Sequence, residues 1–190
     1  MMRRLLVFLC VAFVSLAAFA QERTTANTRP EDVATQQDFE NRVSKYYDLR
    51  NKLGGKDTQQ SEDAQAVKSR QEELAAKVRQ QRANAKHEDI FSDKITELFK
   101  RQLRSAYRGS NGARISTSLA HAEPMPKMRL QVNAEYPAQA PLQSTPPTIL
   151  MNLPRLPKGL EYRFVGRDLI LYDSATNLIV DYVHEALPSR

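Results

Sequence analysis

Beyond an apolar N-terminus, hydrophobic residues in the first half of the chain recur at helical spacing and predict three helices. The first begins at Pro30, because a proline followed by two acidic residues favours a helix start, and it ends at Gly54. We expect Ser61 to cap the second helix and Ser92 to cap the third, which ends before Gly109. The expected core positions are Val33, Phe39, Val43, Tyr46, Leu49 and Leu53 in the first segment, Ala64, Val67, Leu74 and Val78 in the second, and Ile95, Leu98, Phe99, Leu103 and Tyr107 in the third.

The apolar stripe of the second segment is narrow, because nearly all of its other residues are charged or carry amides. Such a helix can bury only a thin seam, either against the first helix or against a partner chain. We favour packing within the chain. A homo-oligomer formed through the helical region, as a coiled coil, is the alternative, although the heptads are few.

From residue 127 the pattern changes to the two-residue period of a strand. Residues 127–133 alternate between apolar and polar side chains, which predicts a half-buried strand. The proline-rich stretch that follows excludes a long helix. Within it, the apolar patch 149–153 is expected to form a short helix or an extended segment that docks on the core.

Residues 160–183, with the sequence LEYRFVGRDLILYDSATNLIVDYV, predict three short strands joined by two tight turns. Gly166 suits the first turn, because glycine adopts a positive φ at almost no steric cost. Asn177 ends the second turn and tolerates the left-handed region better than most residues. The nearly continuous apolar run 169–172 is typical of a central strand that is buried on both faces.

These patterns predict an α+β fold, in which an N-terminal helical hairpin or three-helix region packs on a small antiparallel β-meander. We expect Phe99, Leu103 and Tyr107 to cover one face of the sheet. The expected divisions are a signal peptide (1–20), a disordered tail (21–30), a charged helical region (31–108), a linker (109–126), a small β domain with a proline-rich insertion (127–185) and a C-terminal tail (186–190).

The chain opens with MMRRLLVFLCVAFVSLAAFA, which has the order of a secretory signal peptide. Two arginines precede an apolar run, and Ala18-Phe19-Ala20 supplies a small-x-small site, so we expect cleavage after Ala20 and export to the periplasm. The apolar run is shorter than a bilayer span, so no transmembrane segment is expected after cleavage. Cys10 is the only cysteine of the 190 residues, so the mature fold is expected to hold without a disulfide.

We find no pattern of residues that predicts catalysis, a metal centre or a cofactor. The three histidines, His87, His121 and His184, are scattered without ligand spacing. No G-x-S-x-G motif or glycine-rich phosphate loop is present. Three aspartates, Asp168, Asp173 and Asp181, lie in or beside the strands and turns, where we expect their carboxylates to bond nearby backbone N–H groups.

One charged feature stands out in a chain whose formal net charge is +6. Lys100, Arg101, Arg104 and Arg108 follow one another without an intervening acid, and the three arginines are spaced to share a helix face. The face can be a solvated surface opposite the apolar stripe. Alternatively, it can bind an acidic protein or an anionic surface. Expected export argues against nucleic acid as the partner.

Residues 165–181, VGRDLILYDSATNLIVD, resemble the C-terminal hairpin of the periplasmic nickel/cobalt homeostasis (RcnB-like) family. The matching positions are Val165, Gly166, Asp168, Leu171, Ala175, Thr176 and Asp181, and the family has glycine where this chain has Asn177. A longer stretch, 128–188, resembles the C-terminal half of uncharacterised exported bacterial proteins, which also carry an element matched here by Ile90, Phe91, Leu98 and Phe99. The longer resemblance implies export and a helical-plus-β build, and it implies no activity.

The sequence therefore predicts an exported, non-enzymatic interaction or accessory module of the cell envelope. Its partner would be an envelope protein or an anionic surface that meets the helical half at Lys100, Arg101, Arg104 and Arg108. The alternative, which the hairpin resemblance implies, is a metal-responsive periplasmic protein. Saturable metal binding that depends on His87 or His184 would identify that alternative.

Overall fold

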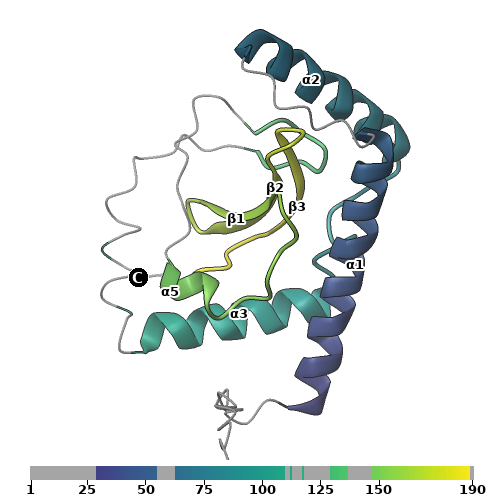
Figure 1. The fold of residues 1–190 in the computed structure, drawn as a ribbon. Coiled ribbons are helices and arrows are strands. Elements are labelled where there is room, and N and C mark those ends of the chain that lie inside the picture. The colour runs from purple at the N-terminus through teal and green to yellow at the C-terminus, as the bar shows by residue number, and fades with distance from the viewer. Residues whose placement is uncertain are drawn as a thin grey trace, which may run out of the picture.

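The computed structural model describes residues 29–54, 63–109, 112, 117, 129–136 and 147–188 (Figure 1). Its elements are α1 (Pro30–Gly54), α2 (Ala64–Gln81), α3 (Asp93–Arg108), α5 (Pro147–Leu150), β1 (Leu160–Val165), β2 (Asp168–Asp173) and β3 (Leu178–Val183). The three strands form one antiparallel sheet in the order β1-β2-β3. The predicted α+β fold, with helices that precede a β-meander, is confirmed.

The three long helices border the sheet, with α2 and α3 at opposite ends of α1 (Figure 1). The starts of α1 and α3 agree with the prediction, but the cap of α2 does not. Its N-cap is Asp63, whose carboxylate accepts a hydrogen bond from the backbone N–H of Gln65 at 3.0 Å. The prediction of Ser61 as this cap is therefore wrong, and Ser61 lies outside the described residues. Ser92 occupies the N-cap of α3 as predicted, but its side chain makes no capping hydrogen bond.

The helices bury narrower faces than the sequence pattern predicts. In α1, Phe39, Val43 and Tyr46 are buried, whereas Val33 is 57% exposed because it stands in the first turn, before the helix reaches the core. In α2 the expected positions Ala64 and Val67 are exposed, and burial is limited to the C-terminal half of the helix, at Ala75 and Val78. The thin seam of α2 therefore packs within the chain, against α1 and the common core.

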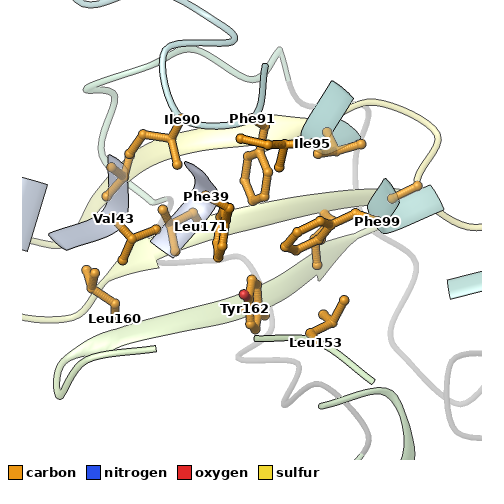
Figure 2. Packing of buried hydrophobic residues seen from close by; sticks show 14 of the residues in the cluster. Phe39, Val43, Ile90, Phe91, Ile95, Phe99, Leu153, Leu160, Tyr162 and Leu171 are labelled. Atoms are coloured by element: carbon orange, nitrogen blue, oxygen red, sulfur yellow. The ribbon is translucent and has the colours of Figure 1, made fainter. Parts of the chain in front are cut away.

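The core between the helices and the sheet is built on aromatic rings (Figure 2). Phe39 of α1 lies 4.8 Å from Phe99 of α3 and 5.5 Å from Phe91, measured between ring centroids. Phe99 in turn lies 6.1 Å from Tyr162 of β1, so that α3 covers this face of the sheet. The prediction that Phe99 and Leu103 pack on the sheet is confirmed, and Tyr107 lies partly buried at the edge of the same cluster.

The two turns of the meander use the residues that the sequence indicates. Gly166 has a φ of 60° between β1 and β2, and Asn177 has a φ of 55° between β2 and β3. The register pairs Val165 with Asp168 in the first hairpin and Asp173 with Leu178 in the second. All six residues of β2 except Asp168 are buried, which confirms the prediction of a central strand covered on both faces.

A β-bulge in β3 decides which of its side chains face the helices. The register shifts so that Leu171 pairs with Asp181 whereas Tyr172 pairs with Ile179. The extra residue reverses the alternation of the strand. Asp181 and Val183 therefore face the helical side, and Tyr182 joins the opposite face.

The opposite face of the sheet is covered in part by residues 129–136. This segment is not the strand that the alternation at 127–133 predicts: its described part turns at Val132 and Asn133, where Asn133 has a φ of 63°. It nevertheless pairs with β3 after the turn, because the N–H of Ile179 donates to the carbonyl of Ala134 at 2.9 Å. The first residues of the predicted strand, 127–128, lie outside the described residues.

The residues after β3 also belong to the core. Ala186 and Leu187, which are predicted to lie in a C-terminal tail, are 2% and 5% exposed. The guanidinium of Arg167, in the first turn, donates two hydrogen bonds to the carbonyl of Leu187, at 2.9 and 3.1 Å. The end of the described chain is thereby fixed to the β1–β2 turn.

Candidate functional site

The basic residues predicted as an interaction site lie on the outer side of α3. Arg101, Arg104 and Arg108 are exposed, and Lys100 is half-buried. Arg101, Arg104 and Arg108, together with Ser105 and Gly109, line a shallow hollow on the surface. The structure therefore brings the three predicted arginines together on one helix face, which we call the basic face together with Lys100.

The basic face is positioned by the apolar side of the same helix. Phe99 and Leu103 are buried in the core, whereas the three arginines, which are three and four residues apart, share an exposed stripe on another side of the helix. Cations near a helix C-terminus are also stabilised by the partial negative charge of the last carbonyls. Of these arginines, Arg108 lies in the last turn of α3 and receives this local stabilisation.

The arginines of the basic face differ in their partners. Arg101 forms an ion pair with Asp32 at the start of α1, which fixes the two helices to each other. The Nε–H of Arg104 donates to the carbonyl of Lys100 at 3.3 Å. Within the described part of the chain, Arg104 and Arg108 form no ion pair with an acidic side chain. Their charges are therefore available to an external anion.

A second cluster joins two of the scattered histidines. The ring of His87 stacks on Tyr182, with centroids 4.2 Å apart and planes at 10°. The ring of His184 meets both edge-on, at 4.9 Å from Tyr182 and 5.6 Å from His87. The spacing of the histidines in the sequence does not reveal this arrangement, because His87 and Tyr182 are nearly a hundred residues apart along the chain.

Each of these histidines has a carboxylate partner at Nδ1. The Nδ1 of His87 lies 3.3 Å from Asp181, and the Nδ1 of His184 lies 3.2 Å from Asp168. A carboxylate at Nδ1 fixes the ring and leaves Nε2 for another partner. The Nε2 of His87 is 3.9 Å from the carboxylate of Glu88. Among the described residues, no group of three or more potential metal ligands converges, and His121 lies outside them.

Asp181 is the most heavily bonded carboxylate of the described chain. It is fully buried, and its Oδ2 accepts hydrogen bonds from the backbone N–H groups of Ile90 at 2.8 Å and Phe91 at 2.9 Å. Its Oδ1 accepts from Tyr182 at 2.8 Å and Glu88 at 3.3 Å. The expected bonding to nearby backbone is thus only part of its role, because three of the four donors come from the loop before α3.

Asp173, the last residue of β2, connects the sheet to α1. Its carboxylate accepts hydrogen bonds from the hydroxyl of Tyr46 at 2.7 Å and from Arg50 at 3.0 Å, and it also accepts from the N–H of Ala175 at 3.0 Å. Burial raises the pKa of Tyr46, and the negative charge of Asp173 raises that pKa further. These partners indicate a structural role, since both oxygens of the buried carboxylate are engaged.

Comparison with known proteins adds no relative. No family model, curated protein or solved structure matches this chain. The likeness of the hairpin to the nickel/cobalt homeostasis family therefore stays a prediction, as does the likeness to exported proteins. Within the described residues, no helix is long and apolar enough to cross a membrane.

Proposed function

We propose that the protein is an exported accessory component of the cell envelope that binds an anionic partner through the basic face of α3. The observation that carries the proposal is the pair Arg104 and Arg108, exposed on one face and without an acidic partner among the described residues. Guanidinium groups bind carboxylate and phosphate oxygens through paired hydrogen bonds. A shallow hollow lined by three of them suits an anionic group.

The export part of this proposal rests on the N-terminal segment, which has the order of a signal peptide and lies outside the described residues. The non-enzymatic part is supported by how the buried carboxylates are used. Asp173 and Asp181 are bonded to backbone N–H groups and to fixed side chains, so both serve to hold the fold together.

The test is the distribution of the protein between envelope and soluble fractions of its host. The variant Arg104→Glu/Arg108→Glu should move the protein into the soluble fraction, because it replaces two attractive charges with two repulsive ones. We leave Arg101 unchanged in this variant, because it already pairs with Asp32 and its reversal would disturb the contact between α1 and α3.

A matched control reverses two lysines on α2, at the opposite end of α1. Lys68 and Lys77 are exposed, and among the described residues each pairs only with a glutamate of its own helix. Lys68→Glu/Lys77→Glu changes the net charge equally and should leave the distribution unchanged. It places like charges beside Glu72 and Glu73 on an exposed helix, which costs only a few tenths of a kcal/mol for each pair, and thermal melting verifies that the variant is folded. Equal effects of the two double variants, or none from either, would refute a specific role for the basic face.

The pairing of His87 with His184 favours a second candidate, a metal-responsive periplasmic protein. Both rings are held by carboxylates at Nδ1, which is the arrangement of many histidine ligands. Native mass spectrometry of the protein, purified from the periplasm without chelators, should then show a bound metal. Saturable nickel, cobalt or copper binding that is lost in His87→Gln and His184→Gln would support this candidate, and no binding at micromolar metal would remove it.

A further inference from the structure

We propose that the anionic partner of the basic face is a membrane surface rich in anionic phospholipids, and that Leu150 and Met151 enter the lipid interface beside it. This inference rests on the proposed function, because it names the partner of the same face. Two independent observations carry it. Arg104 and Arg108 have no acidic partner among the described residues, and apolar side chains are exposed at Leu150, the last residue of α5, and at Met151, which follows it.

The apolar component lies against the same helix. α5 packs on α3, and Figure 1 shows it beside the C-terminal half of α3, which carries Arg104 and Arg108. Ile149 is buried in the core and anchors α5, whereas Leu150 is 42% exposed and Met151 is 77% exposed. Met151 is the most exposed large hydrophobic residue of the described chain.

The combination favours a lipid surface over a protein partner. A stable protein interface buries a substantial apolar core, and two exposed side chains at the end of one short helix fall short of it. Membrane adsorption needs less, because shallow insertion of a few apolar groups adds to the attraction of lysine and arginine for anionic headgroups. Arginine also matches the phosphate of a headgroup in geometry.

The expected contribution of each charge follows from membrane electrostatics. A basic side chain close to an anionic surface strengthens binding about fivefold, so neutralising two should weaken it about twenty-fivefold. This attraction is screened by salt, because the Debye length falls from about 10 Å at 0.1 M to about 3 Å at 1 M. The contribution of an inserted methionine, roughly tenfold, should persist at high salt.

The experiment is co-sedimentation of the exported protein with vesicles. One set contains phosphatidylglycerol and phosphatidylethanolamine, and the other contains phosphatidylcholine alone. We expect binding to the first set only, weakened about twenty-fivefold in Arg104→Gln/Arg108→Gln and unchanged in the matched control Lys68→Gln/Lys77→Gln. Met151→Ser should weaken binding roughly tenfold at both low and high salt. Circular dichroism and thermal melting verify that each variant is folded.

Failure of this inference can be distinguished from failure of the proposed function. If the protein does not bind anionic vesicles but still needs Arg104 and Arg108 to associate with the envelope fraction, the lipid is excluded and an acidic protein takes its place. If the glutamine variant and its control bind vesicles equally, the basic face is not the docking surface. If envelope association is also insensitive to these arginines, the proposed function falls with it.

Discussion

Replacing Asp181 by asparagine tests how the sheet holds the loop before α3. Asparagine keeps the shape of the side chain but replaces one acceptor oxygen with an NH2 group. Whichever way the amide is placed, this group faces backbone donors, which are Ile90 and Phe91 on one side and Tyr182 and Glu88 on the other. Two hydrogen bonds are therefore lost, and the two backbone N–H groups that made them face the new NH2 group, which is itself a donor.

The magnitude follows from the number and type of these bonds. A hydrogen bond to a charged acceptor contributes about 1.5–3 kcal/mol, and the site is fully buried, so that water cannot replace the lost acceptor. We expect Asp181→Asn to lower the free energy of unfolding by about 3–5 kcal/mol. For a chain of this size, the melting temperature should fall by about 10 °C.

The assay is urea and thermal unfolding followed by far-ultraviolet circular dichroism. Asp168→Asn is the matched control. Asp168 also accepts a hydrogen bond from a backbone N–H, that of Glu185 at 2.8 Å, and also pairs with a histidine, but its side chain is partly exposed to water. In the control, the free energy of unfolding should fall by less than about 1 kcal/mol. A loss below 1 kcal/mol in Asp181→Asn itself would refute the reasoning, since it would mean that the loop is held by packing alone.

Two further predictions concern the other polar contacts of the sheet. Tyr46→Phe removes the hydroxyl that bonds Asp173 and should cost about 1–3 kcal/mol at neutral pH. Because the pKa of Tyr46 is raised in the folded state, the contribution of its hydroxyl is complete below the ordinary tyrosine value near pH 10 and is lost above it. The stability gap between wild type and variant should therefore close by up to about 1.4 kcal/mol per pH unit above pH 10, and a gap that stays constant in urea titrations at pH 9 to 11 would contradict this. Asn177→Ala should cost about 2 kcal/mol in the same unfolding assay, because it loses the acceptor of the Tyr172 hydroxyl at 2.9 Å and disfavours the positive φ of the turn, whereas an unchanged midpoint would contradict the role assigned to the amide.

The sequence predicts well those features that are set by neighbouring residues. The helix starting at Pro30, the turns at Gly166 and Asn177 and the buried strand β2 all follow from local periodicity and backbone preference, and the structure confirms them. The basic face is also local, because helical spacing alone places three arginines on one side of α3. The strand expected at 127–133 failed because alternation describes a pattern of burial, which a turn docked on a sheet can also produce.

The histidine cluster could not be predicted, because it depends on the bulge in β3. In a regular strand the side chain of Asp181 would point to the side of the sheet that Tyr182 now faces. The carboxylate would then face away from the loop that carries His87. No residue type in this stretch signals a bulge, since β3 contains neither glycine nor proline. The contacts between His87, Tyr182 and His184 therefore emerge only when the register is known.

The two buried aspartates connect this scaffold to the proposed binding surface. Asp173, at the end of β2, holds α1 through Tyr46, and Asp181, in β3, holds the loop that leads into α3. The orientation of α3 is thus fixed at two points on the helical side of the sheet, by the hydrogen bonds of Asp181 to the loop and by Phe99 within the core. Arg104 and Arg108 are presented outward because the opposite side of their helix is committed to these contacts. A binding surface built in this way needs no change of shape on docking, so its affinity should depend on charge and salt rather than on the folding of a segment.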